Sequence, residues 1–326
     1  MPDIARIKSK RLYLDCPDPD SMDLEQLLFW HQQGLKQWRQ RSSATSPLQT
    51  GYSWLVIKQK LAHRLLTQCN LCVHDCRVDR IQGERGYCQL DAEIRISGSY
   101  LHWGEEAPIS PTWAVFFSGC TMHCVYCHNW RETFDLKAGR VVDAQQLAQD
   151  LETHQGQYQT ISFIGGTPEP QLHGILDLAL ALPDTVQAPL VFNSNATLSQ
   201  IGLELMEGVI DIYLPDFKHG NQACAWQLTK IDNYLQSMDT NLKAYRAQRA
   251  GVLVRHLVIP GHLECCTHPI LTRLAQDYPE FSVNVMFQYR PMYQAANKPL
   301  INRSLSEDEE AQVKQWIQEL GVKVLK

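Results

Sequence analysis

The chain has 326 residues, 44% of them hydrophobic and 20% charged, which is the composition of an ordinary globular protein. Its net charge of −5 leaves no basic surface for a phosphate backbone, so we expect no nucleic-acid partner. The sequence has no apolar run of the ~18 residues that a membrane span needs and no apolar leader, so we expect a cytoplasmic protein without a membrane partner.

Helices are predicted for the first part of the chain. We expect residues 1–50 to form a helical N-terminal extension with a helix at Asp23–Trp38. The polar run 39–51 predicts a linker, because Ser, Thr, Pro and Gly gather there. A second helix, at Trp54–Thr67, leads the chain to its first group of cysteines.

Residues 51–112 are predicted to form a cysteine-rich metal-binding segment that ends in a hairpin. In a reducing compartment, clustered cysteines bind metal more often than they form disulfides. Four thiolates close one metal shell, and structural zinc and an auxiliary [4Fe–4S] cluster match that number equally well. Thiols without a metal are the alternative. The hairpin is expected at 92–103, with its turn around Gly98. The cysteines, spaced Cys-x2-Cys-x3-Cys-x11-Cys, are Cys69, Cys72, Cys76 and Cys88.

From residue 113 onward, apolar β-rich runs alternate with stretches of helical spacing, which predicts βαβ units and a parallel sheet. Six such units favour a partial (β/α)6 barrel for residues 113–326, with a C-terminal helix, and a doubly wound sheet is the alternative. In either fold, functional residues gather at the C-terminal ends of the strands. The expected strands lie within 113–119, 160–166, 188–195, 208–217, 251–261 and 281–289, and the expected helices within 142–154, 171–182, 198–207 and 228–245.

Three cysteines directly follow the first strand of this region, in the run "GCTMHCVYCHNW" at residues 119–130, which we call the cysteine loop. Structural zinc needs four ligands, and a [4Fe–4S] cluster is ordinarily held by four thiolates. Three thiolates leave one iron open to a substrate or cofactor. The loop therefore predicts an open iron–sulfur site, against the alternative of a chance group of buried thiols. Its cysteines are Cys120, Cys124 and Cys127.

The four other cysteines show no metal-binding spacing. They are scattered along the chain or merely adjacent, and we interpret them as small buried side chains. They are Cys16, Cys224, Cys265 and Cys266.

The cysteine loop resembles the signature of radical S-adenosylmethionine (radical SAM) enzymes, Cys-x3-Cys-x-aromatic-Cys, with Tyr126 as the aromatic residue. "FIGGTPEP", at the end of the second strand, is similar to the family's Gly-Gly-Glu-Pro motif. Gly165 and Gly166 match that motif, and Thr167 replaces its glutamate. The resemblance implies a partial (β/α)6 barrel and a cluster whose open iron is chelated by S-adenosylmethionine. It also implies reductive cleavage of that cofactor to a 5′-deoxyadenosyl radical.

Three further segments, "DIYLPDFKHG", "VRHLVIPGH" and "MFQYRPMY", resemble one branch of the family. This branch holds the pyruvate formate-lyase-activating enzymes, and the likeness is strongest to the activase-like proteins of the AmmeMemoRadiSam system. The branch carries a similar cysteine-rich N-terminal segment, usually with Pro-Arg where this chain has Val73-His74.

The resemblance also implies cofactor-binding residues at later strand ends. Asp216 and Lys218 match the Asp-x-Lys that helps form the cofactor site in the activating enzymes. Arg255 matches an arginine near the methionine carboxylate, where a charge-assisted bond is expected; a structural salt bridge is its alternative. Asn193 and Asn195 are expected to hydrogen-bond the ribose or carboxylate, or else to form a turn.

The sequence therefore predicts a cytosolic radical SAM enzyme that abstracts hydrogen from an organic or peptidyl substrate. A low-potential electron donor, such as a flavodoxin or ferredoxin, is implied because the cluster must be reduced. One alternative is a glycyl-radical activase whose substrate is a protein backbone. Another is a non-catalytic iron–sulfur or zinc protein. Neither the substrate nor a catalytic side chain can be named from the residues.

Overall fold

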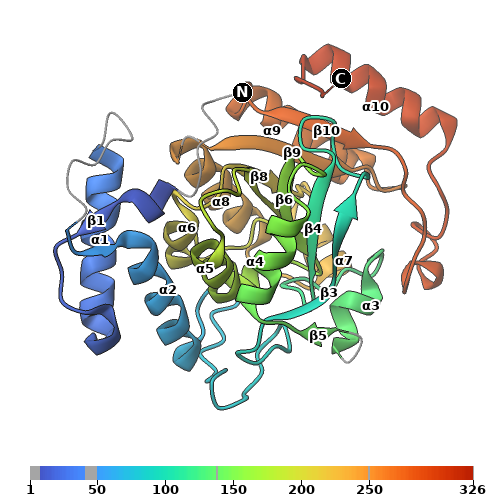
Figure 1. Ribbon diagram of the computed structural model, residues 1–326. Coiled ribbons are helices and arrows are strands. Elements are labelled where there is room, and N and C mark those ends of the chain that lie inside the picture. The colour runs from blue at the N-terminus through green and yellow to red at the C-terminus, as the bar shows by residue number, and fades with distance from the viewer. Residues whose placement is uncertain (1–7, 41–49, 137–138, 249, 326) are drawn as a thin grey trace. The chain divides into compact units, whose positions relative to one another are not determined.

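The protein is described by a computed structural model that covers residues 8–40, 50–136, 139–248 and 250–325 (Figure 1). Its contacts divide the chain into two compact units. Unit 1 comprises residues 1–121, 132–192 and 198–211, and unit 2 comprises residues 122–131, 193–197 and 212–326. The sequence divides the chain differently, at residues 50 and 112. That division into an N-terminal extension, a cysteine-rich segment and a barrel remains our proposal.

The N-terminal helices belong to unit 1. Helix α1 (Leu24–Gln40) packs beside α2 (Trp54–Leu65), as both Figure 1 and their contacts show, and the two helices confirm the sequence prediction. Strands β1 (Tyr13–Leu14) and β2 (Tyr52–Ser53) pair antiparallel. The Ser53 hydroxyl begins α2 by accepting the Leu55 amide. Most of the predicted linker at 39–51 lies outside the described residues.

A buried lysine fixes α2 to the rest of unit 1. The Lys58 ammonium donates to the carbonyls of Glu204, Leu205 and Glu207, at 2.7, 2.9 and 2.7 Å. These carbonyls lie at the C-terminal end of α6 (Gln200–Met206), where a cation is favoured by the helix dipole. Helix α2 is therefore fixed to the end of α6 within unit 1.

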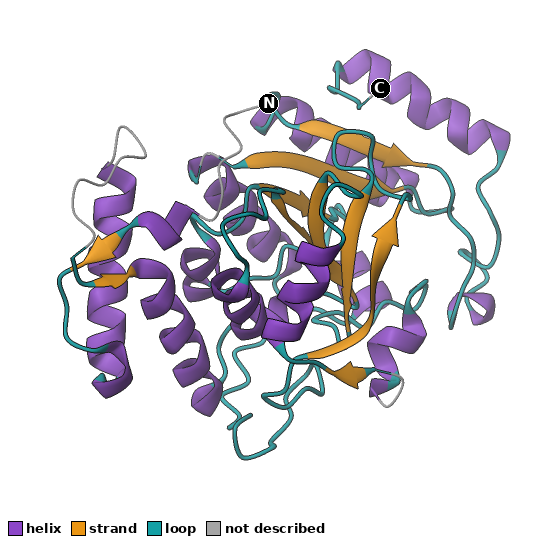
Figure 2. Cartoon of the chain, viewed as in Figure 1, coloured by secondary structure: helices purple, strands orange, loops and turns teal. Residues whose placement is uncertain are grey.

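The sheet of unit 1 has the strand order β7-β6-β4-β3-β5. Strands β4, β6 and the first residues of β7 run parallel, whereas β3 pairs antiparallel with β4 and β5 (Figure 2). Each parallel strand is followed by a helix, as the alternating pattern predicted. The strands are β3 (Arg95–His102), β4 (Thr112–Phe117), β5 (Arg140–Val141), β6 (Thr160–Gly165) and β7 (Leu190–Ser194), and the helices include α3 (Trp130–Phe134), α4 (Ala144–Thr153) and α5 (Leu172–Ala181).

The predicted hairpin at 92–103 is wrong, because this segment forms the single strand β3. Its small residues mark a bulge, where the register against β4 shifts between Ile96 and Gly98. The strand continues past this point because Tyr100 stacks on Phe116 of β4, with ring centroids 4.9 Å apart. Pairing with β4 therefore overrides the local turn tendency of Ser-Gly-Ser.

Unit 2 contains the parallel strands β8 (Ile212–Pro215), β9 (Gly251–Leu257) and β10 (Ser282–Met286), in the order β10-β9-β8. Within each unit the parallel strands follow one another in chain order, without the reversal of a doubly wound sheet. The α/β fold and its six parallel strands confirm the predicted (β/α)6 architecture. The helices of unit 2 are α7 (Gln222–Thr229), α8 (Tyr234–Ala247), α9 (His268–Asp277) and α10 (Glu307–Leu320), with a π-helical turn at Leu263–Thr267.

The single helix predicted at 228–245 is also wrong, because the chain breaks between α7 and α8. Lys230 and Asn233 both take left-handed φ angles, of 57° and 55°. The Gln222 side chain stabilises the break by donating to the Ile231 carbonyl and accepting the Tyr234 amide, each at 2.8 Å.

None of the described helices has the length and apolar character needed to cross a membrane.

Candidate functional site

The four upstream cysteines line one small pocket in unit 1. We call them the four-cysteine group, and they are Cys69, Cys72, Cys76 and Cys88. The segment folds on itself, since the Cys69 amide donates to the Val78 carbonyl at 3.0 Å and the Arg77 amide to the Cys69 carbonyl at 2.9 Å. Gly86 makes the return possible, because a β-carbon there would lie 2.7 Å from the Cys76 sulfur.

Burial disfavours the anionic form of these thiols, and one buried cation opposes that effect. Burial raises the pKa of the Cys72 and Cys88 thiols, and the neighbouring thiols raise it further. Arg80, only 1% exposed, opposes this shift at Cys88 and places Nη1 3.9 Å from the Cys69 sulfur. The same nitrogen donates to the Pro170 carbonyl at 2.7 Å, which fixes the guanidinium beside the thiols. A buried cation at this position favours bound thiolates.

The first residues of the cysteine loop pack against the four-cysteine group. Gly119 has a φ of 78°, and a β-carbon there would lie 2.9 Å from the Cys88 carbonyl oxygen. His74 Nε2 donates to the Thr121 carbonyl at 2.7 Å, while its ring stacks on Tyr87 at 3.7 Å. The buried Cys120 lies between these two contacts along the chain. His74 thus connects the two cysteine segments.

The two glycines of the Gly-Gly-x-Pro motif lie where no side chain fits. Gly165 has a φ of 111°, and a β-carbon there would overlap the Phe117 backbone at the end of β4. A β-carbon on Gly166 would overlap the Gly119 carbonyl oxygen. The Thr167 amide donates to that same oxygen at 3.0 Å. The end of β6 is therefore held directly against the start of the cysteine loop.

Thr167, which replaces the usual glutamate, contacts a buried carboxylate that the sequence did not single out. Its hydroxyl donates to Glu169, two residues later. Glu169 is fully buried, in the short helical turn before α5. A carboxylate is thus present beside this turn, contributed by a different position from the one the motif specifies.

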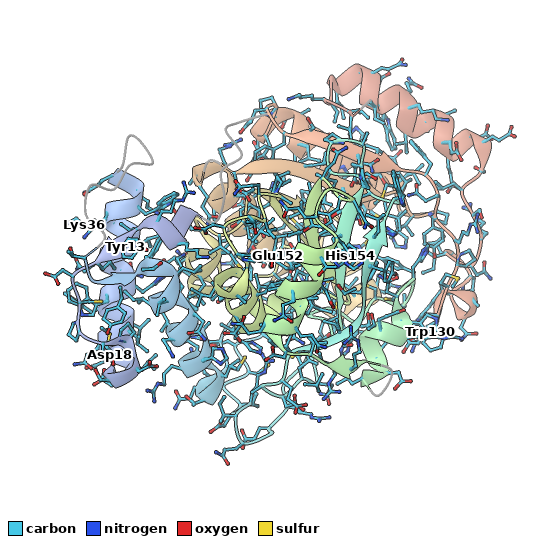
Figure 3. All side chains as sticks on the ribbon, in the orientation of Figure 1. Tyr13, Asp18, Lys36, Trp130, Glu152 and His154 are labelled. Atoms are coloured by element: carbon cyan, nitrogen blue, oxygen red, sulfur yellow. The ribbon has the colours of Figure 1, made fainter. Side chains whose placement is uncertain are left out.

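The rest of the cysteine loop belongs to unit 2, where other segments fix its backbone. The amides of His123 and Val125 donate to the carbonyls of Thr229 and Leu228, at 3.0 and 2.8 Å. These two carbonyls lie at the C-terminal end of α7. The side chains of Cys124 and Tyr126 are buried, and that of Cys127 is half-buried. Trp130, labelled in Figure 3, ends the loop and stacks on Tyr293 with centroids 5.7 Å apart.

The residues at the ends of β8 and β9 also meet in unit 2. Asp216 and Lys218 form an ion pair. The Phe217 amide donates to the Arg255 carbonyl at 2.7 Å, and Asp216 pairs with Arg255 in a parallel bridge. Burial raises the pKa of Cys124 to about 12, and the Lys218 ammonium opposes that shift. Lys218 is therefore close enough to Cys124 to favour its thiolate.

The asparagines at the end of β7 have a partly structural setting. Asn195 is buried, and Asn193 is half-buried. Between them, the Ser194 carbonyl accepts the Asp216 amide at 2.9 Å. This bond joins the end of β7 to the segment after β8.

Sequence reasoning missed a buried histidine beside the cysteine loop. His219 Nε2 lies 3.4 Å from the Tyr126 hydroxyl, and the His219 ring packs edge-on against Tyr234. Burial lowers the pKa of His219 well below its usual value, with a further contribution from Lys218. A neutral imidazole therefore contacts the aromatic residue of the signature. Its position next to the Asp-x-Lys motif was the available sequence signal.

Comparison with known proteins agrees with this geometry. The family model described as the radical SAM superfamily matches residues 114–274. An uncharacterized protein of Methanocaldococcus jannaschii is 36% identical over 261 residues, which cover 78% of this chain and 75% of that protein. Pyruvate formate-lyase 1-activating enzyme of Escherichia coli is 25% identical over 153 residues, which cover 45% of this chain and 61% of the enzyme.

Solved structures match the chain at lower sequence identity than these two proteins do. Streptococcus suis SuiB bound to the precursor peptide SuiA has a TM-score of 0.48 at 10% identity, covering 90% of this chain and 59% of that chain. Methylornithine synthase has a TM-score of 0.47 at 11% identity, covering 94% of this chain and 76% of that chain. The sequence matches, the described strands and the position of the cysteine loop after β4 together show that the chain belongs to the radical SAM superfamily.

Proposed function

We propose that the protein is an enzyme that cleaves S-adenosylmethionine reductively and abstracts hydrogen from an organic or peptidyl substrate. The observation that carries this proposal is the close packing between the glycine turn after β6 and the start of the cysteine loop. It orients the loop at a strand end, which is where a parallel α/β fold positions its chemistry. When bound, the cluster and S-adenosylmethionine supply the radical chemistry, and the chain supplies binding and orientation.

The residues present fit that cofactor set. The loop offers three thiols, and the glycines at 165 and 166 let the turn after β6 pack directly against the start of that loop. The Cys124 thiol is buried beside Lys218, so a metal-bound thiolate there is favoured by a nearby cation. We assign Asp216, Lys218 and Arg255 to cofactor binding, and Asn193 and Asn195 to its polar contacts. Tyr126 and Thr167 are also assigned to cofactor binding.

The four-cysteine group is proposed as a second metal site, separate from the cysteine loop. Its four thiols line one pocket. Four sulfur ligands suit an auxiliary [4Fe–4S] cluster and a structural zinc ion alike. We favour the auxiliary cluster, and the iron content of a variant without the loop cysteines tests this choice.

A low-potential donor such as a flavodoxin or ferredoxin is proposed as the electron source, because reductive cleavage consumes an electron. A glycyl-radical activase is the second candidate. It is favoured by the 153-residue match to pyruvate formate-lyase 1-activating enzyme, which covers less than two thirds of that enzyme. In that case the substrate would be the backbone of another protein.

The deciding experiment combines the anaerobically reconstituted protein with S-adenosylmethionine and dithionite and measures 5′-deoxyadenosine. We expect the wild type to release it and Cys124→Ala to release none. Cys16→Ala is the matched control, because Cys16 lies outside both cysteine groups and should leave the product yield unchanged. No product from wild-type protein that carries its full iron content would instead support a non-catalytic iron–sulfur protein.

A further inference from the structure

Unit 2 contains another convergence of soft ligands, built from residues that we interpreted from the sequence as ordinary buried side chains. Cys224 and Cys266 are indeed buried, but the fold brings them together with two further ligands. Cys224 lies in the first turn of α7, and three further ligands come from the turn between β9 and α9. The ligand atoms of all four residues lie within 4.8 Å of one another. We call them the Cys3His group, and they are Cys224, His262, Cys265 and Cys266.

The distances within this group match the edges of a tetrahedral zinc site. The Cys224 and Cys265 sulfurs lie 3.6 Å apart. His262 Nδ1 lies 3.5 Å from the first and 3.4 Å from the second. Zinc bonds of ~2.3 Å to sulfur and ~2.0–2.1 Å to nitrogen put tetrahedral ligands roughly 3.8 and 3.6 Å apart. A disulfide requires sulfurs at ~2.05 Å, so the pair is not a bridge.

We propose that Cys224, His262, Cys265 and Cys266 bind one zinc ion, which is structural because the ligand set leaves no open position. Three cysteines and one histidine are a known composition of structural zinc sites. Packing alone does not account for the group, because its members come from segments about forty residues apart and point soft atoms at one place. This proposal does not depend on the chemistry proposed for the cysteine loop.

The surrounding residues hold the ligands as a metal site requires. The Asn221 side chain donates to the Cys224 sulfur at 3.3 Å and to the Cys265 carbonyl at 2.6 Å. Its oxygen accepts the Cys224 amide at 2.8 Å and so begins α7. One asparagine thus fixes two ligand-bearing segments relative to each other. Outer groups of this kind orient metal ligands and strengthen binding.

Backbone geometry brings the adjacent cysteines to the same place. The amides of Cys266 and Thr267 both donate to the His262 carbonyl, at 2.9 and 3.3 Å, which forms the wide π-helical turn. Such turns are uncommon and frequently occur at functional sites. Gly220 allows close approach to this turn, because a β-carbon there would lie 2.6 Å from the Cys266 carbonyl oxygen.

A metal here would stabilise the segments that hold the cysteine loop. Helix α7 carries Cys224 at its start, and its last residues accept the loop amides of His123 and Val125. On the other side, His256 of β9 contacts the Thr267 hydroxyl at 2.9 Å and the Phe217 carbonyl at 2.8 Å. The zinc site therefore braces α7 and the connections after β8 and β9.

The test uses the full chain purified anaerobically, with metal content measured by mass spectrometry and zinc coordination by X-ray absorption. We expect about one zinc per chain, with three sulfur ligands and one nitrogen ligand. The double variant Cys224→Ser/Cys265→Ser should lose this zinc and keep its iron, while Cys16→Ser should keep both. The coordination measured on wild-type protein decides the matter even if the double variant fails to fold.

Four results would overturn the proposal. Zinc bound by four sulfurs and no nitrogen would place the ion in the four-cysteine group. Zinc content that does not change in the double variant would exclude these ligands. A wild-type chain that lacks zinc after growth with added zinc would show that the group binds no metal. An intact mass that reveals a Cys224–Cys265 disulfide would lead to the same conclusion. Failure of the proposed enzymatic function would instead appear as absent 5′-deoxyadenosine with the zinc signal intact.

Discussion

The packing of Gly165 against β4 allows a quantitative test of how the cysteine loop is held. Gly165→Ala adds a methyl group that overlaps the Phe117 backbone, at a position whose φ is 111°. An unfavourable backbone region costs about 1–3 kcal/mol, and forced overpacking costs a further 1–3 kcal/mol. We therefore expect the variant to lose about 2–6 kcal/mol of unfolding free energy, a large share of the ~5–15 kcal/mol typical of native proteins.

Gly156→Ala separates the two causes. Gly156 has a φ of 89°, and nothing lies within 4 Å of a β-carbon built on it. This control shares the backbone strain of Gly165→Ala, and it shares the entropy that alanine removes from the unfolded chain. The difference between the two variants should therefore be the overlap alone, about 1–3 kcal/mol. Urea unfolding of the reduced, metal-free chain measures it.

Gly166→Ala adds a functional readout, because its methyl group would displace the Gly119 carbonyl beside Cys120. We expect lower iron uptake and a lower yield of 5′-deoxyadenosine from this variant than from Gly156→Ala. The reasoning is refuted if Gly165→Ala is no less stable than Gly156→Ala. In that case β4 and β6 would separate at no cost, and their contact would not hold the loop.

Further predictions concern other parts of the chain. Arg255→Ala should weaken S-adenosylmethionine binding by about 1.5–3 kcal/mol in equilibrium dialysis, and unchanged affinity at low salt would make Arg255 a structural residue. A variant lacking all three cysteines of the loop should retain about four irons per chain in the four-cysteine group, and a chain without iron would contradict an auxiliary cluster there. The pKa of the Glu309 carboxyl is lowered to about 2. The main cause is the hydrogen bond from Arg303, and the amides of Ser306 and Gly261 lower it further. This carboxylate should therefore stabilise the fold by about 1 kcal/mol at neutral pH, after allowance for solvent screening. That contribution should disappear as the pH falls from about 4.5 towards 2, so Glu309→Gln and wild type should converge in acid unfolding experiments.

Much of the fold could be predicted because its signals are local. Each parallel strand is a short apolar run, and each cysteine of the loop lies within eight residues of the others. The hairpin predicted around Gly98 was wrong because a β-bulge uses the same small residues as a turn. The break between α7 and α8 was missed because the apolar spacing continues through Lys230 and Asn233, and no glycine or proline marks it.

The Cys3His group could not be predicted from spacing, because Cys224 and His262 are separated by α8 and β9. Only the folded chain brings such ligands together, and a pair of adjacent cysteines carries little information by itself. His219 was missed for a related reason. His219 matters because the folded chain places its ring beside the Tyr126 hydroxyl, a residue far from it in the sequence.

The contact between His74 and Thr121 has a consequence for how the protein acquires its iron. Loading the four-cysteine group would order the segment that carries His74, and this order would reach the backbone beside Cys120. Binding at either place would then raise the affinity at the other by the same factor, since thermodynamic coupling is reciprocal. Iron uptake by the wild type should therefore be cooperative, with fewer half-loaded chains than independent binding would give. His74→Ala would make the two clusters assemble independently and allow half-loaded chains to accumulate.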